Sequence, residues 1–270
     1  MLYVFLVLAL LASCALTWVA SGFATLHALW QVPVFFAGSF LALVLLFLLV
    51  VLISCLFVDP KKLLEKPSGY FRFLLNEFCR LALALGGVHV NVTGLEKVPR
   101  DSRFLLVSNH RFAFDPLVFY SSMPWADLAF LSKKENFSIF VVAQIMRKVL
   151  CLPVDRNNDR ESLKSILKAI QFIKDDKASI AVFPEGRTNR TADPLLPYRC
   201  GVFKIAQKAN VPIVVATIEG TERIAHNVPW RRTHVYLSIR EVIPAETVKA
   251  TKTNALTEGI RSKMIAELGK

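Results

Sequence analysis

Hydrophobic positions dominate the first fifth of the chain. Residues 2–20 form one apolar run, residues 32–58 form another, and no Asp, Glu, Lys or Arg occurs before residue 59. At about 1.5 Å per residue, each run as a helix is long enough to cross a hydrocarbon core of about 30 Å. The weakly polar stretch between them holds Ser21, Gly22, His27, Gln31 and Pro33 and offers a place for a hairpin turn. The pattern predicts two hydrophobic helices that either span the membrane or dip into one leaflet.

Residues 59–87 are first basic and then amphipathic. The basic residues that follow the second apolar run are Lys61, Lys62, Lys66, Arg72 and Arg80. Such a cluster next to a hydrophobic segment is placed in the cytoplasm by the positive-inside rule. Apolar residues between Phe71 and Leu85 recur at helical spacing, with Arg72, Asn76, Glu77 and Arg80 on other faces. This predicts an amphipathic helix that packs on a protein core or lies on a membrane surface.

From residue 88 onward, short apolar runs alternate with helical periods. The runs are Phe104–Val107, Val149–Val154, Ser179–Phe183, Val211–Ile218 and Val235–Ile239. Helical spacing occurs at residues 163–173, and further helices are expected from Gly201 and over 254–268. This alternation is typical of a sheet covered by helices. We therefore expect an α/β fold with a mixed, largely parallel sheet. The predicted organisation is a two-helix membrane anchor (1–58), a juxtamembrane segment (59–87) and a globular domain (88–270).

The net charge of the chain narrows the range of binding partners to be expected. The net charge is +12, and every charged residue lies after residue 58. A basic domain suggests nucleic acid or an anionic membrane surface as its partner. The hydrophobic N-terminal segment favours the membrane, and no zinc-finger spacing or RNA-binding aromatic signature supports nucleic acid. Five cysteines without a C-x-x-C pair are expected to be reduced thiols.

Chemically useful side chains follow three of the predicted strands. His110 comes just after residues 104–107, Asp155 and Arg156 follow residues 149–154, and Pro184–Thr188 follow residues 179–183. Ligands of open α/β sheets bind beyond the carboxyl ends of the strands. A histidine, arginines and carboxylates are therefore expected at one edge of the sheet, where they suit an anionic substrate and proton transfer.

Each of these residues alone also has a purely structural explanation. A histidine at a strand end is often structural, and Asp115 before Pro116 has the form of a helix N-cap with proline in the first turn. Arg156 alone fits a surface arginine, and Pro184-Glu185-Gly186 alone fits a tight turn.

The order and spacing of the motifs are more specific than their members. Asn109-His110 is followed by Asp115 after four residues, then by Val154-Asp155-Arg156, by Phe183-Pro184-Glu185-Gly186-Arg187-Thr188, and by Val211-Pro212-Ile213-Val214. Over roughly residues 85–245 the chain resembles the lysophospholipid acyltransferase family, which includes glycerol-3-phosphate and 1-acylglycerol-3-phosphate acyltransferases.

The resemblance implies a role for each matching residue. His110 matches the catalytic histidine and Asp115 its partner, Arg156 matches an arginine that contacts the acceptor's phosphate, and Pro212 lies in the fourth motif. Glu185 and Gly186 match the acceptor-binding third motif. Lys133 and Lys134 resemble a basic stretch between the first two motifs. The family usually reads Glu-Gly-Thr-Arg-Ser, whereas Arg187 and Thr188 are exchanged here. This leaves the phosphate contact of Arg187, and the identity of the acceptor, open.

The implied reaction moves a fatty acyl group from a thioester to a lysophospholipid hydroxyl. A histidine takes the hydroxyl proton, and a carboxylate stabilises the imidazolium. The resemblance implies no cofactor or metal, only acyl-CoA or acyl-carrier protein as donor. The expected acceptor is 1-acyl-sn-glycerol-3-phosphate, giving phosphatidic acid; the alternatives are glycerol-3-phosphate or another lysolipid. A hydrolase would need a nucleophile such as that of Gly-x-Ser-x-Gly, which is missing from the sequence. A membrane-surface adaptor would not need His110, Asp115 and Glu185 together.

Overall fold

The computed structural model describes residues 1–23, 26, 28–59, 66–155 and 157–268. It divides into two compact units, residues 1–59 and residues 60–270. His27, Lys61 and Lys62, which the sequence placed in the turn and in the basic cluster, lie outside the described residues.

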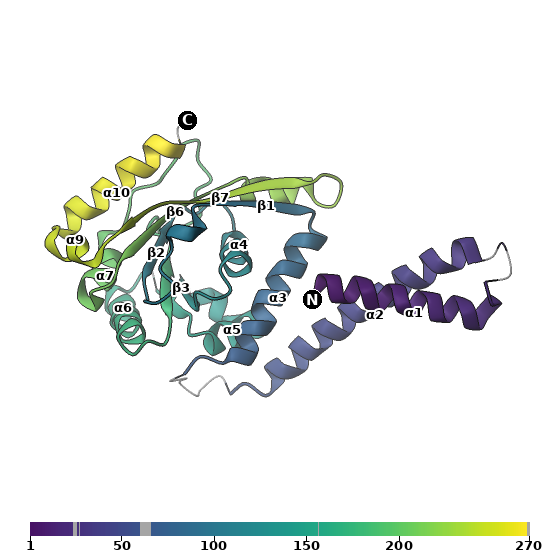
Figure 1. Ribbon diagram of the computed structural model, residues 1–270. Helices are drawn as coiled ribbons and strands as arrows, with labels where there is room; N and C mark the ends of the chain where they lie inside the picture. The colour runs from purple at the N-terminus through teal and green to yellow at the C-terminus, as the bar shows by residue number, and fades with distance from the viewer. Residues whose placement is uncertain (24–25, 27, 60–65, 156, 269–270) are drawn as a thin grey trace. The chain divides into compact units, whose positions relative to one another are not determined.

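The first unit is a helical hairpin, coloured purple in Figure 1. It consists of α1 (Leu2–Ser21) and α2 (Ala28–Leu56), and both helices are long and apolar enough to cross a membrane. They contact each other through rings such as Phe5 and Phe47, whose centroids lie 6.2 Å apart.

The turn of this hairpin is shorter than the sequence predicted. Gln31 and Pro33 lie inside α2, and the Ser21 hydroxyl donates to Gln31 Oε1 at 2.7 Å. Pro33 is the sixth residue of α2, beyond the first four N–H groups that have no partner in a helix, so it removes one backbone hydrogen bond of the first turns without ending the helix.

The second unit is built on a seven-stranded sheet in the order β1-β7-β6-β2-β5-β3-β4. Its strands are β1 (Val88–Thr93), β2 (Leu105–Ser108), β3 (Leu128–Lys133), β4 (Leu152–Val154), β5 (Ser179–Val182), β6 (Ile213–Glu219) and β7 (Thr233–Ile243). Every neighbouring pair is parallel except β6 and β7.

Helices cover both faces of this sheet (Figure 1). One face carries α3 (Gly69–Leu85), α4 (Asp115–Ser122) and α5 (Phe140–Lys148). The other carries α6 (Asp159–Lys174), α7 (Lys204–Ala209), α9 (Ala245–Ala250) and α10 (Thr253–Leu268), while α8 (Ile224–Asn227) precedes β7. Alternate strand residues such as Leu105, Ile180 and Ile213 form the core beneath the second layer. The α/β fold with a largely parallel sheet is confirmed.

The strands depart from the predicted runs at three places. Val149–Cys151 closes α5 as a turn, with Leu150 at a φ of 66°, so only Leu152–Val154 is extended. Two strands, β1 and β3, were not among the predicted runs. β1 is an edge strand of half-exposed residues, and β3 ends in polar ones, so neither reads as a continuous apolar run.

The amphipathic helix is also corrected in one respect. Arg72, Asn76 and Glu77 of α3 were expected on faces other than the apolar one, but all three residues are buried. Arg72, which was also expected in the basic cluster, has partners in the protein. Its Nη1 donates to the Leu128 carbonyl at 3.1 Å, and its Nε lies 3.0 Å from Asp127 Oδ1. Pairing compensates for burying the charge, so Arg72 ties α3 to the start of β3.

Candidate active site

The site lies where β2 and β5 end side by side. The two strands are parallel, with Val107 opposite Val182, so the residues that follow them emerge at the same edge. Asn109 and His110 continue from β2, and Phe183–Gly186 continue from β5. Asn109 is buried and anchors its strand end, since its side-chain amide both donates to the Ile218 carbonyl and accepts from the Ile218 N–H, each at 2.8 Å.

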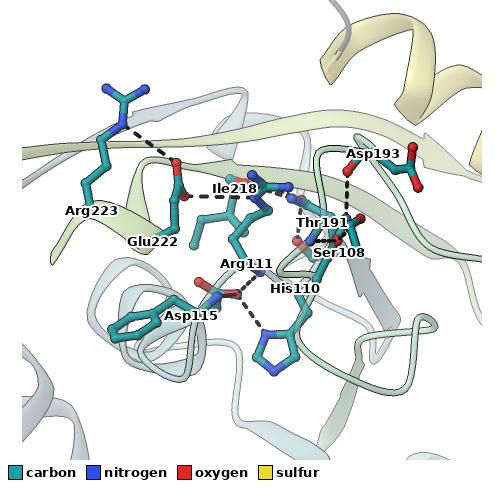
Figure 2. Close-up of polar contacts among 12 residues, drawn as sticks. Ser108, His110, Arg111, Asp115, Thr191, Asp193, Ile218, Glu222 and Arg223 are labelled. Carbon is teal, nitrogen blue, oxygen red and sulfur yellow. Dashed lines mark hydrogen bonds and ion pairs between the residues drawn. The ribbon is translucent and has the colours of Figure 1, made fainter. Parts of the chain in front are cut away.

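His110 and Asp115 form a direct pair. His110 Nδ1 lies 2.8 Å from Asp115 Oδ2, and Asp115 is fully buried. An ionised carboxylate can only accept hydrogen bonds, so Nδ1 carries the ring proton and Nε2 keeps its lone pair. Figure 2 shows the second ring nitrogen pointing away from Asp115. This is the arrangement required of a histidine that takes a proton from a substrate.

Asp115 does not cap the helix that it opens. The residue at the cap position is Phe114, no side chain caps α4, and Pro116 lies in the first turn as expected. Asp115 Oδ2 instead accepts from the backbone N–H groups of Arg111 (2.7 Å) and Phe112 (3.0 Å) in the preceding loop. The cap interpretation is therefore wrong, because the carboxylate turns back toward His110 rather than toward the helix N–H groups.

The backbone and ring of His110 are held from the β5 side. The His110 N–H donates to Glu185 Oε1 at 2.7 Å, and its carbonyl accepts from the Asn189 N–H at 2.7 Å. The Phe183 ring stacks on the imidazole, with centroids 4.2 Å apart and planes 9° apart. The histidine thus has its position fixed from three directions.

Glu185 uses both carboxylate oxygens on the backbone. Oε1 accepts from His110, and Oε2 accepts from the Leu196 N–H at 2.9 Å. The side chain is 5 % exposed, and this burial raises its pKa above the ordinary glutamate value. Glu185 therefore joins the histidine loop to the loop that follows β5, and its carboxylate faces backbone N–H groups rather than the neighbouring cavity.

That cavity has a volume of about 500 Å³ and is lined by His110. One part of its wall is apolar, with residues such as Phe130, Leu131, Val154 and Val202. Its charged lining residues are Lys133, Arg187, Arg190 and Arg199, and no carboxylate lines it in the part of the chain that the structure describes. A cavity with an apolar wall and several cations suits a ligand that carries both a hydrocarbon chain and an anion.

The predicted site residues are only partly brought together. Gly186, Arg187 and Lys133 line the cavity with His110. Lys134 is outside the lining and lies 3.2 Å from Asp155 Oδ2, while Arg156 lies outside the described residues. Pro212 stands at the amino end of β6, where its carbonyl accepts from the Leu105 N–H, away from the strand ends that carry His110.

Three residues of the site were not singled out from the sequence, and Phe183 was named only as part of its motif. Phe183 and Asn189 follow β5, so the strand-end argument that found Glu185 would have reached them. Arg190 and Arg199 lie on the loop that follows, and no periodic pattern points to them. Within the ranges that the structure describes, no group of three His, Cys, Asp or Glu side chains is placed to hold a metal ion.

Comparison with known proteins agrees with this geometry. The acyltransferase family model matches residues 89–219. The chain is 27% identical over 199 residues to the 1-acyl-sn-glycerol-3-phosphate acyltransferase of Borreliella burgdorferi, covering 73% of this chain and 78% of that protein. It is 32% identical over 189 residues to the probable 1-acyl-sn-glycerol-3-phosphate acyltransferase of Mycoplasma pneumoniae, covering 67% and 69%.

A solved structure shares the fold. The 1-acyl-sn-glycerophosphate acyltransferase PlsC of Thermotoga maritima superposes with a TM-score of 0.62 at 22% identity, over 82% of this chain and 86% of that one. The matched region contains His110, Asp115 and the cavity-lining residues described above. The chain is therefore a member of the lysophospholipid acyltransferase family.

Proposed function

We propose that this acyltransferase esterifies the free hydroxyl of 1-acyl-sn-glycerol-3-phosphate and so makes phosphatidic acid. The observation that carries the proposal is the His110–Asp115 pair at the wall of a cavity that combines an apolar side with cations. The names of the related proteins from Borreliella burgdorferi and Mycoplasma pneumoniae support this choice of acceptor.

In the proposed reaction, His110 Nε2 removes the acceptor's hydroxyl proton as that oxygen attacks the thioester carbonyl. The new carbon–oxygen bond forms, the carbon–sulfur bond breaks, and the imidazolium returns the proton to the departing thiolate. The products are phosphatidic acid, which is a 1,2-diacylglycerol 3-phosphate, and the free thiol of coenzyme A or of acyl-carrier protein. Asp115 keeps the ring proton on Nδ1 and stabilises the imidazolium through the 2.8 Å contact.

The cations of the cavity are proposed to bind the acceptor's phosphate. Lys133 and Arg187 line the cavity, and a guanidinium pairs well with phosphate oxygens. Arg156 is retained as a proposed phosphate contact by its motif alone. Gly186, which lines the cavity, is likewise retained as a proposed acceptor-binding residue by its motif.

The direct test is a panel of acceptors against both donors. Purified full-length protein in liposomes is given 1-acyl-sn-glycerol-3-phosphate, glycerol-3-phosphate or an uncharged 1-acylglycerol, with acyl-CoA or acyl-carrier-protein thioester, and the products are read by lipid mass spectrometry. Phosphatidic acid as the main product, absent with His110→Ala, is the expected result. Preferred acylation of glycerol-3-phosphate would replace the proposed acceptor, and no acyl transfer to any acceptor would refute the reaction.

We further propose that α1 and α2 anchor the enzyme in a membrane with the catalytic unit on the cytoplasmic side. Lys66, just beyond the hydrophobic hairpin, agrees with this orientation. Because a hydrophobic anchor is insensitive to ionic strength, the protein should remain with membranes during a high-salt wash. Release of the intact chain by salt, or digestion of the catalytic unit only from outside the cell, would contradict the proposal.

A further inference from the structure

The loop that follows β5 returns to the site at Arg199. The Arg199 N–H donates to the Pro184 carbonyl at 2.9 Å, which fixes its backbone beside the Glu185-Gly186 turn. Its side chain then crosses the face of Gly186 and reaches the cavity that His110 lines. Arg199 lies fourteen positions beyond Glu185 and outside the third motif, so the motif does not identify it.

Gly186 leaves the space that this side chain occupies. A Cβ added at residue 186 would stand 2.9 Å from Arg199 Nε and 3.2 Å from Arg199 Cδ, closer than such atoms normally approach. Any larger residue at position 186 would therefore move the guanidinium. The glycine has a second reason to be there, since its φ of 70° disfavours other residues.

The charge of Arg199 is available for a ligand. Among the residues that the structure describes, no ion pair or side-chain hydrogen bond involves its guanidinium, and no carboxylate lines the cavity. Arg187 also lines the cavity, but no polar contact of its side chain is seen among the described residues. The loop that contains Arg187 has no helix or strand at that position. The backbone hydrogen bond of Arg199 and its packing beside Gly186 restrict where its side chain can lie, which reduces the entropy lost when a ligand binds.

From these contacts we propose that Arg199, positioned by Gly186, is the main guanidinium that binds the acceptor's phosphate. In the usual motif an arginine stands two positions after the glycine, whereas here that position is Thr188 and the arginine, Arg187, directly follows the glycine. Arg199 would take over the role of the arginine at the usual position. The assignment rests on the proposed function, since it needs a phosphate-bearing acceptor. It gives Gly186 a specific task, which is to leave room for the phosphate-binding side chain.

The experiment measures the KM values of both substrates for Arg199→Gln, Arg199→Lys and a matched control, Lys204→Gln. Lys204 is an exposed cation five residues along the chain and outside the cavity lining. Arg199→Gln should raise the KM for 1-acyl-sn-glycerol-3-phosphate roughly tenfold to a hundredfold and leave the thioester KM and the melting temperature nearly unchanged. Arg199→Lys should recover part of the loss, because a point charge replaces a two-pronged donor. Lys204→Gln should behave as the parent.

A double-mutant cycle with Gly186→Ala tests the positioning step. The added methyl group should raise the acceptor KM in the parent protein and have much less effect when Arg199 is already Gln, whereas backbone strain at residue 186 would be the same in both backgrounds. Additive effects would overturn the role of Gly186. If the parent enzyme acylates the phosphate-bearing acceptor but Arg199→Gln and Lys204→Gln have equal acceptor KM values, the role of Arg199 is overturned. If the parent acylates no phosphate-bearing acceptor, the proposed function itself fails.

Discussion

The loops that follow β2 and β5 differ in the burial and the bonding of their charged side chains. After β2, Asp115 is fully buried and one of its oxygens accepts from His110 and from two backbone N–H groups. After β5, Arg187, Arg190 and Arg199 are exposed at the cavity, and no ion pair is seen for them in the described part of the chain. Glu185, although it belongs to the β5 side, resembles Asp115 in being buried and in accepting hydrogen bonds from two backbone N–H groups.

In the proposed function, the difference corresponds to two tasks. A proton-transfer pair works best when its geometry is fixed before the substrate arrives, so its partners lie within the protein. Cations that bind an anionic substrate must instead leave their donors free until it arrives. The buried group should therefore control turnover and stability, and the exposed group should control the acceptor KM.

The largest effect is expected from His110→Ala. Loss of the general base should lower kcat by about two to four orders of magnitude. His226→Ala, which changes an exposed histidine of α8, serves as the matched control and should keep parental turnover. Co-sedimentation with anionic liposomes should be unchanged in both variants. Parental turnover in His110→Ala would exclude His110 as the general base.

Glu185→Ala is expected to act on stability as well as on turnover. It would leave the N–H groups of His110 and Leu196 without an acceptor, at a cost of about 1–3 kcal/mol of unfolding free energy for each. Glu185→Gln keeps one acceptor oxygen and should lose less. Thermal unfolding of the full chain in detergent measures both. An acceptor KM that rises while stability stays parental would instead place Glu185 at the substrate, as its motif implies.

Arg187→Ala should have a smaller effect, confined to the acceptor. Because its side chain is exposed and unconstrained, we expect the acceptor KM to rise by less than about tenfold, with kcat and stability unchanged. Steady-state kinetics with each substrate varied in turn give the two KM values. A rise larger than that of Arg199→Gln would transfer the main phosphate contact to Arg187.

The smallest effect concerns the pH dependence of stability. Burial raises the folded-state pKa of Glu185, so the folded protein binds its proton more tightly than the unfolded chain does. This contribution is fully present below the ordinary glutamate pKa of about 4.3 and is lost as the pH rises through the raised value. The stability of the parent relative to Glu185→Gln should therefore decline with rising pH across that window. Melting temperatures of both proteins at several pH values would show it, and an opposite slope would contradict the assignment.

The features predicted correctly from the sequence are those that depend on the local pattern of apolar and polar residues. The hydrophobic hairpin, the core strands β2, β5, β6 and β7, and the residues directly beyond strand ends were all accessible, because periodicity and strand ends can be read along the chain. His110 and Glu185 were found in this way, whereas the pairing of Asp115 with His110 came from the family resemblance.

The features that the sequence did not predict depend on where loops place their side chains in the folded protein. Arg199 reaches the cavity only because a loop of more than ten residues brings it back beside Gly186. Asp115 was interpreted as a cap from its neighbour Pro116, yet its carboxylate turns toward Arg111 and Phe112. Glu185 was assigned to the acceptor by motif, and only the fold reveals its two backbone partners.

The turnover of Asp115→Asn tests the His110–Asp115 mechanism most directly. Asn has nearly the same shape, and its amide nitrogen would take the place of Oδ1, which has no partner in the described structure, so the variant should fold with at most about 1–3 kcal/mol lost. An amide oxygen facing Nδ1 lacks the charge that stabilises the imidazolium, and an amide nitrogen there imposes the wrong tautomer. We predict that kcat falls by about two to four orders of magnitude while both KM values stay near those of the parent. A folded Asp115→Asn enzyme with parental turnover would contradict the mechanism.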